Sequence, residues 1–251
     1  MQFDYLQLAG FDIQSVSAAV SPAAEGFHAT FSSDLAYGQI ILPRNDQQAL
    51  TIDLTRLEFP KINLEAPSQL KSMDPRQFIP VDFSADQIVL SGDSLGSLAF
   101  ELRPETSGAL FTAISGNLLG IKPGFFANEA PTEFFWGFDG ESYLSRLTGP
   151  VAVDNIGDLL AGFGIPEVVD SESGRMAMDL LWRGKPWDIR KETITGDFQV
   201  SLANGSFYRT SGPAEATLKL VSLFNFANWL RRLKLDFSDV VGKNLAYNDL
   251  Q

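Results

Sequence analysis

The side chains that most often carry out catalysis are scarce in this chain and do not form a set. His28 is the only histidine and there is no cysteine, so no Ser-His-Asp or Cys-His arrangement can be assembled without His28. A general base must also lie within hydrogen-bond reach of the proton that it removes, and a single histidine is usually an ordinary surface or turn residue. The lack of cysteine excludes disulfides and thiolate metal sites. The sequence therefore predicts a protein that is not an enzyme.

Acidic residues and glycines are numerous, but their spacing does not suit a metal site or a phosphate loop. Asp170, Glu172 and Asp179 lie near one another in the sequence, yet they lack the regular alternation of calcium ligands. Gly92 and Gly96 are not followed by the lysine and hydroxyl residue of a phosphate-binding loop, and turns explain them better. We therefore expect no metal and no cofactor.

The net charge of the chain limits the classes of partner that it is expected to bind. Its net charge is −12, from 31 acidic and 19 basic residues. This argues against nucleic acid, where binding depends on neutralised phosphates, and against general attraction to an anionic membrane surface. No run approaches the roughly 20 apolar residues of a membrane-spanning helix, and we expect no signal peptide because no basic start precedes an apolar stretch. The lack of disulfides fits the cytosol and the periplasm equally.

Most of the chain alternates apolar with polar residues, which is typical of strands with one buried face. Part of this pattern recurs after 82 positions, where Leu6 and Leu8 correspond to Ile88 and Leu90. The match continues without a gap through a proline and a glycine that mark a second turn. Each copy predicts three strands joined by two turns. Repeats of one such unit predict an elongated array in which neighbouring units bury each other's faces.

The C-terminal third predicts two further strands. One strand carries the alternating apolar residues Met176, Met178, Leu180 and Trp182, and the other carries Phe198, Val200 and Leu202. Asn204-Gly205 follows and is the residue pair that a tight hairpin turn prefers. Residues 170–174 predict a loop.

Two short helices are also predicted. Residues 154–163 begin with a possible N-cap, Asp154, carry an apolar stripe and are followed by Gly164 and Pro166, which end the helix. Residues 221–232 are apolar around most of the helix, so this second helix must lie against a large apolar surface.

The expected fold is mainly β, with antiparallel strands and short turns. Residues 60–80 are rich in proline and predict a connection between a first unit, 1–59, and a continuing unit, 81–251. The apolar face must be covered, either by a second sheet, by closure into a barrel or by curling into a trough. Periodicity alone does not choose between these arrangements.

Several strings resemble the YhdP family, whose members are large AsmA-like proteins of the Gram-negative envelope. They are L-L-W-R-G-K-P-W-D-I at 180–189, N-G-S-F at 204–207, L-R-R-L-K-L-D-F-S-D-V-V-G-K-N-L-A-Y at 230–247 and I-D-L-T-R-L-E-F-P at 52–60. The resemblance implies a long, curled β-sheet whose hydrophobic groove conducts phospholipid between the inner and outer membranes. It also implies a fragment in the periplasm of a protein whose membrane anchor lies far upstream.

This resemblance gives the alternating apolar residues a role as the lining of a lipid groove. The predicted lining residues are Leu6, Leu8, Ile88, Leu90, Leu98, Phe100, Leu102, Met176, Met178, Leu180, Phe198, Val200 and Leu202. The second helix would plug or gate the groove through Phe224, Phe226, Trp229 and Leu230. Arg231 and Arg232 would complement the negative end of that helix, and at the rim they could contact a lipid phosphate.

One alternative from a different class is a structural or adhesive β-protein with a closed, dry core. It shares the alternation but predicts no open apolar surface. A hydrolase on a β scaffold would need an assembled nucleophile and base, and the sequence predicts no such pair.

Overall fold

A single sheet of thirteen strands makes up most of the computed structural model. The structure describes residues 2–8, 11–24, 26–45, 47–59, 73–124, 126, 129–155, 169–188 and 193–207. The strands are β1 (Gln2–Leu8), β2 (Phe11–Ala23), β3 (Gly26–Ser32), β4 (Ala36–Pro43), β5 (Leu50–Phe59), β6 (Val81–Leu90), β7 (Asp93–Glu105), β8 (Gly108–Leu118), β9 (Ile121–Pro123), β10 (Glu133–Phe138), β11 (Tyr143–Val153), β12 (Val169–Arg183) and β13 (Ile194–Phe207).

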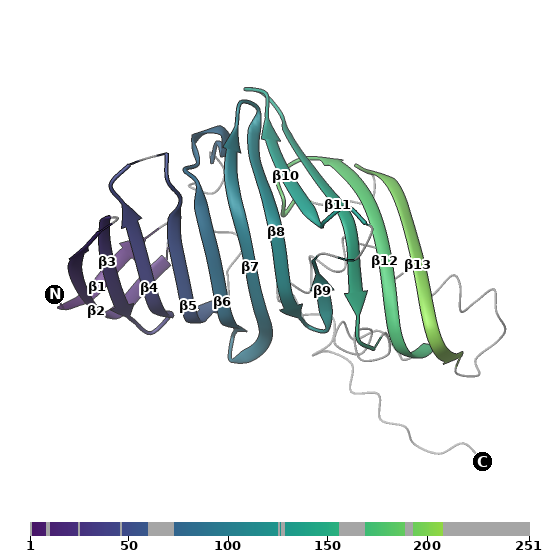
Figure 1. Ribbon diagram of the computed structural model, residues 1–251, viewed down its shortest axis with the longest axis horizontal. Helices are drawn as coiled ribbons and strands as arrows, with labels where there is room; N and C mark the ends of the chain where they lie inside the picture. The colour runs from purple at the N-terminus through teal and green to yellow at the C-terminus, as the bar shows by residue number, and fades with distance from the viewer. Residues whose placement is uncertain are drawn as a thin grey trace, which may run out of the picture.

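The strands lie side by side in the order of the sequence, so the sheet is long in the direction across its strands (Figure 1). The short strand β9 lies off this path and pairs with β8 and β11. All neighbouring pairs are antiparallel except β5 and β6, which are parallel. The predicted antiparallel sheet is therefore a mixed sheet, because this one pair is parallel. A parallel pair needs a long connection that returns the chain to the same end, and residues 60–80 supply it.

The predicted three-strand repeat agrees with the strand boundaries. Adding 82 to the bounds of β2 gives those of β7, and β3 and β8 begin 82 residues apart, at Gly26 and Gly108. The sheet is continuous across the proline-rich connection, because β5 pairs with β6 along its length. The division into units at 1–59 and 81–251 stays a prediction.

Two local predictions in the C-terminal third are wrong. Residues 170–174 are part of β12 and not a loop, and Asn204-Gly205 lies inside β13 and not in a hairpin turn. The two strands pair from Trp182 opposite Ile194 to Val169 opposite Phe207. This long ladder gives the backbone groups partners, and it outweighs the local turn preference of an Asn-Gly pair.

The described part of the chain contains one short helical element, the 3-10 turn η2 (Pro75–Gln77). The predicted helix at 221–232 lies outside the described residues. Of the predicted helix at 154–163 only Asp154 and Asn155 are described, and neither is helical. No helix among the described residues is both long enough and apolar enough to span a membrane.

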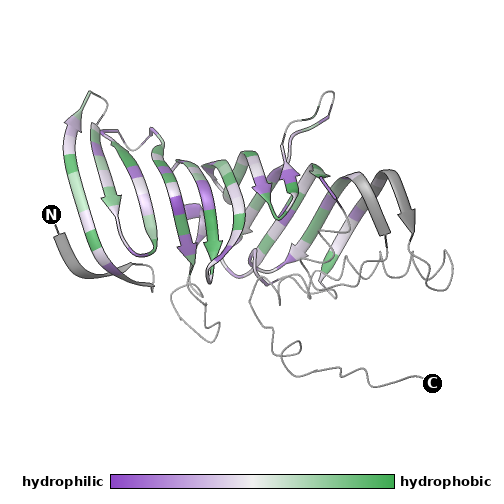
Figure 2. Ribbon diagram, turned by 90° about the horizontal axis from the view of Figure 1, so that it is seen from below, coloured by the Kyte–Doolittle hydropathy of each residue, from purple (hydrophilic) through white to green (hydrophobic). Residues whose placement is uncertain are grey.

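The two faces of the sheet differ in chemistry. Ile52, Phe83 and Phe100 lie opposite one another on β5, β6 and β7 and mark what we call the apolar face. Their sequence neighbours Asp53 and Glu101 mark the opposite, polar face, since successive side chains of a strand point to opposite sides. The alternation of apolar and polar residues along the strands is visible in Figure 2.

Glycines allow neighbouring strands to approach closely at two positions in the sheet. Gly196 in β13 has φ +135°, and a Cβ there would lie 1.9 Å from the carbonyl oxygen of Asp179 in β12. Gly116 in β8 has φ +132°, and a Cβ would lie 2.3 Å from the carbonyl oxygen of Ser97. A larger residue at either position would have to move a paired strand.

A hydrophobic cluster lies around the parallel pair. Leu54, Ala85 and Ile88 are buried there, and partly buried side chains of β3, β7 and β8 pack against them. This cluster joins the strands before and after the long connection.

We predict that Leu54→Ala lowers the free energy of unfolding by about 2–4 kcal/mol, because it leaves a cavity in this cluster. Urea denaturation of the 251-residue chain would measure the change. Val20→Ala is the control, since Val20 is 56% exposed and its truncation should cost under about 1 kcal/mol. Equal losses for the two variants would contradict the assignment of the core.

Candidate functional site

A row of aromatic side chains crosses the apolar face. Its members, which we call the aromatic row, are Phe83 of β6, Phe100 of β7, Phe111 of β8, Phe134 of β10 and Trp182 of β12. Successive ring centroids are 4.9, 5.3, 5.6 and 5.9 Å apart. The strand register causes this spacing by placing Phe83 opposite Phe100 and Phe111 opposite Phe134. The apolar face is therefore continuous along the sheet from β6 to β12.

The predicted lining residues of β6, β7 and β12 lie on this face. Ile88, Leu90, Leu102, Met176 and Leu180 are buried, and Leu98, Phe100 and Met178 are partly buried. Their role as a lipid lining stays a prediction.

The remaining predicted lining residues lie in strands, but their side chains are outside the described part of the chain. The backbone register places Leu6 opposite Ile13 and Leu8 opposite Phe11. It places Phe198, Val200 and Leu202 opposite Met178, Met176 and Gly174.

The exposure of the apolar face changes along the sheet. Near the N-terminal end, Val20, Phe27 and Leu42 are 56%, 50% and 44% exposed. At β10 and β12, Trp136 and Trp182 are only 4% and 3% exposed. Described residues thus cover the apolar face around β10–β12 and leave it open at β2–β4.

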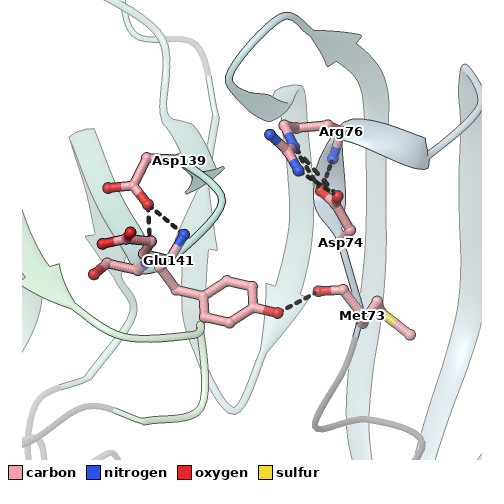
Figure 3. A network of polar contacts seen from close by, with 7 residues as sticks. Met73, Asp74, Arg76, Asp139 and Glu141 are labelled. Carbon is pink, nitrogen blue, oxygen red and sulfur yellow. Dashed lines mark hydrogen bonds and ion pairs between the residues drawn. The ribbon is translucent and has the colours of Figure 1, made fainter.

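Part of the cover is the segment Met73–Pro80, which we call the strap. Its turn η2 contacts β7, β8 and β10. Phe78 packs edge-on against Trp136, with ring centroids 5.4 Å apart. The hydroxyl of Tyr143 in β11 donates a hydrogen bond of 3.0 Å to the carbonyl oxygen of Met73 (Figure 3). These contacts hold the end of the long connection against the apolar face.

Asp74 and Arg76 give the strap its local shape. The carboxylate of Asp74 caps η2 by accepting from the backbone N–H of Arg76, and it also accepts from the Arg76 guanidinium at 2.7 Å (Figure 3). The guanidinium lowers the pKa of the Asp74 carboxyl, and the carboxylate raises the pKa of Arg76.

The rest of the described cover is the loop Gly184–Asp188 after β12, which we call the rim loop. Trp187 packs edge-on against Trp136 at 5.3 Å, and the ammonium of the buried Lys185 lies 4.8 Å from the ring centroid of Tyr143. The indole N–H of Trp182 donates to the carbonyl oxygen of Lys185 at 3.0 Å. This donor is thereby satisfied although Trp182 is buried.

The strap and the rim loop meet at the turn between β10 and β11. The Arg76 guanidinium lies 4.9 Å from the Phe138 ring centroid, and the Phe138 ring stacks on Tyr143 at 4.4 Å. Tyr143 in turn faces Lys185, so two cations and two rings join three segments that are distant in sequence. In the turn itself Asp139 accepts from the backbone N–H groups of Glu141 and Ser142 (Figure 3).

A family comparison matches the whole chain. Residues 1–251 match the model of the family described as YhdP protein. The chain belongs to the YhdP family. This membership agrees with the resemblance of its C-terminal strings and is consistent with an envelope protein. Comparison with curated proteins gave no match, and comparison with solved structures gave none either.

The polar face of this YhdP-family sheet carries ion pairs. Arg103 contacts Asp82 at 2.7 Å, and Arg146 contacts Asp179 at 2.7 Å through a two-pronged hydrogen bond. The guanidinium of Arg146 lowers the pKa of Asp179. Exposed pairs of this kind stabilise a fold little, and their main effect is to keep this face compatible with water.

The single histidine belongs to a hydrogen-bonded row on the polar face. Nε2 of His28 lies 3.0 Å from the Gln39 side-chain oxygen, and the Gln39 amide donates to Asp53, which also accepts from the Ser84 hydroxyl. The described residues contain no group of three or more histidines and carboxylates able to hold a metal.

The predicted lining residues do not include Phe83, Phe111 or Phe134. Strict alternation back from Ile88 would place Asp86 and Ser84 on the apolar face. A bulge between Ala85 and Ile88 breaks this alternation and brings Ala85 and Phe83 onto that face instead. Phe134 belongs to a visible aromatic alternation, but its neighbour Phe111 follows only from the pairing of β10 with β8.

The predicted plug residues Phe224, Phe226, Trp229 and Leu230 and the predicted rim arginines Arg231 and Arg232 lie outside the described residues. Their roles stay predictions.

We predict that Phe78→Ala releases the strap. Loss of the contact with Trp136 should cost about 1 kcal/mol, which corresponds to about fivefold faster amide exchange in residues 73–80. Hydrogen–deuterium exchange with mass spectrometry would measure it. Ile79→Ala is the matched control, because Ile79 is the next residue and is 54% exposed. Indistinguishable exchange in the two variants would refute the role of Phe78.

We also predict that the pKa of Asp74 rises toward its ordinary value in Arg76→Gln. The folded-state pKa lies below the ordinary value, so this carboxylate favours the folded strap above the ordinary pKa. That contribution is lost as the pH falls through the folded-state pKa. Carboxyl chemical shifts in an NMR titration would show the change, and an unchanged midpoint would contradict the pairing.

Proposed function

We propose that this part of the YhdP family conducts phospholipid between the inner and outer membranes of a Gram-negative envelope, within the periplasm and without a chemical step. The single observation that supports this proposal is the apolar face with its aromatic row, which continues across the strands from β6 to β12. Acyl chains would lie on this face, and headgroups would stay in water.

The energetics favour such a surface. A lipid tail in water costs about 0.8 kcal/mol per CH₂, so a chain of sixteen carbons costs on the order of 12 kcal/mol. An apolar face that stays in contact with the tail removes most of this barrier. Neither a nucleotide nor a covalent intermediate is needed for the passage itself.

In the proposed arrangement the sheet curls into a groove around the tails. Glycines with positive φ, such as Gly196 and Gly116, would help the strands to curve. The ion pairs of Arg103 and Arg146 would keep the outer surface in water. Since the strands lie across the long axis of the sheet, the groove would run along that axis (Figure 1).

A closed β-protein with a dry core is less well supported. The described residues build one sheet, and none of them forms a second sheet over the apolar face. Val20, Phe27 and Leu42 are 44–56% exposed on that face. A dry core would bury such side chains, whereas a surface that receives lipid tails must leave them accessible.

A photocrosslinking pair within one strand tests the proposal. We expect a photoreactive amino acid in place of Phe100 to crosslink to phospholipid in cells, and the same amino acid in place of Glu101 to give at least about tenfold less product. The two positions are adjacent in β7 but lie on opposite faces. Mass spectrometry of the purified adducts would measure them.

The outcome is decisive in either direction. Lipid adducts at position 100 and not at 101 support conduction on the apolar face. The absence of adducts at position 100, with no phospholipid extracted from the purified chain, would refute it.

A further inference from the structure

Four buried residues form a strip on the apolar face, on the side of the aromatic row that is nearer to the β10–β11 turn. They are Ala109 of β8, Trp136 of β10, Ser145 of β11 and Trp182 of β12, and the strand register places them opposite one another. Each of them is at most 4% exposed. We call these four residues the covered strip, and it shares Trp182 with the aromatic row.

The neighbouring members of the aromatic row are more accessible. Phe111 and Phe134 lie two positions along the same strands from Ala109 and Trp136, and therefore on the same face, yet they are only partly buried. The cover accounts for this difference, because Phe78 of the strap and Trp187 of the rim loop both pack edge-on against Trp136. Removal of the cover would extend the accessible apolar face by the width of the covered strip.

The rim loop is tied to the covered strip by hydrogen bonds. The Ser145 hydroxyl donates to the carbonyl oxygen of Gly184 at 2.9 Å, and the Trp182 indole N–H donates to that of Lys185 at 3.0 Å. Both donors are buried, so a displaced rim loop would leave them without these partners, at a cost in free energy. The rim loop is thus the fixed part of the cover.

The strap is attached at its two ends. At its start the Tyr143 hydroxyl donates to the carbonyl oxygen of Met73 at 3.0 Å, and at its end the backbone N–H of Leu50 donates to that of Pro80 at 2.9 Å. Between these ends, ring contacts such as that of Phe78 hold it against the sheet.

The shape of the strap is set by bonds within the strap itself. The Asp74 carboxylate accepts from the backbone N–H and from the guanidinium of Arg76. None of these bonds reaches the sheet, so the strap can lift without breaking them.

The indole N–H of Trp136 makes the closed position of the strap less favourable. Its nitrogen is buried, and no described residue accepts a hydrogen bond from it. A buried donor without a partner raises the free energy of the closed arrangement, whereas the Trp182 indole in the same strip is satisfied by the rim loop. When the strap lifts, the Trp136 donor can bond to water or to an oxygen of a lipid.

We propose that the strap is a lid on the apolar face, and that it lifts from Trp136 when an acyl chain occupies the covered strip. The rim loop stays in place while the strap moves between its attachments at Met73 and Pro80. This inference rests on the proposed function, to which it adds a gated segment of the lipid path.

A cleavable crosslink tests the lid. The chain contains no cysteine, so Arg76→Cys with Phe138→Cys introduces a unique pair at a contact between the strap and the sheet. A short bismaleimide with a disulfide in its spacer would lock the strap, and a reducing agent would release it in the same sample. Arg56→Cys with Glu58→Cys, joined by the same reagent within β5, is the control because this pair lies outside the strap.

Two NMR signals report on the two parts of the face. A fluorinated phenylalanine in place of Phe100 reports on the aromatic row, and the indole N–H of Trp136 reports on the covered strip. The 251-residue chain would be titrated with dihexanoyl phosphatidylethanolamine at concentrations where this lipid is monomeric. We expect both signals to shift in the released chain and in the control. Since apparent affinity falls with the fraction of open chain, locking should weaken the response of Trp136 at least about tenfold and leave that of position 100 unchanged.

A second variant tests the lid without a crosslink. Phe78→Ala removes the ring contact with Trp136 and so raises the fraction of open chain. The apparent affinity reported by the Trp136 signal should then increase about fivefold. Ile79→Ala, at the exposed next residue, should leave this affinity unchanged.

Each result bears on one claim. No response of either signal in the native chain would overturn the proposed function and the lid with it. Equal responses of Trp136 in the locked and released chains would overturn the lid alone. A Trp136 signal that never responds while position 100 does would also overturn it, since the cover would then be permanent.

Discussion

Matching of strand register is the constraint on which this structure depends. Each strand alternates apolar and polar residues, and the sheet works as an amphipathic surface only if neighbouring strands place their apolar residues on the same side. A slip of one residue in β6 or β7 would put the acidic side chain of Asp82 or Glu101 into the aromatic row. The cross-strand pairs Phe83–Phe100 and Phe111–Phe134 show that the register aligns the apolar residues within the aromatic row.

Two adjacent bulges keep this register where the pattern of the sequence changes. In β5 two residues separate the apolar side chains of Leu54 and Leu57 instead of one, and in β6 two residues separate Ala85 and Ile88. Leu54 lies opposite Ala85 and Leu57 opposite Ile88, so the extra residue falls at the same place in both strands. The bulge thus moves polar residues of both strands outward without interrupting the apolar face. Because the parallel pair β5–β6 shifts as a unit, the units before and after the long connection share one surface.

The strap and the rim loop cover the apolar face beside the β10–β11 turn. The strap, the rim loop and the turn come from three parts of the chain, and the contacts of Arg76, Phe138, Tyr143 and Lys185 join them. In the proposed function a lipid meets a covered segment here and an open one near Val20, Phe27 and Leu42.

The sequence by itself determined the β class, the repeat of 82 residues and the family, since alternation and motif strings are local properties. The tertiary structure decided which strands pair. It made β5 and β6 parallel, drew residues 170–174 and Asn204-Gly205 into long strands, and brought Phe111 beside Phe134. These outcomes depend on backbone hydrogen bonds between segments far apart in the chain. The ladder of a whole strand outweighs the preference of any one dipeptide, so local patterns could not predict them.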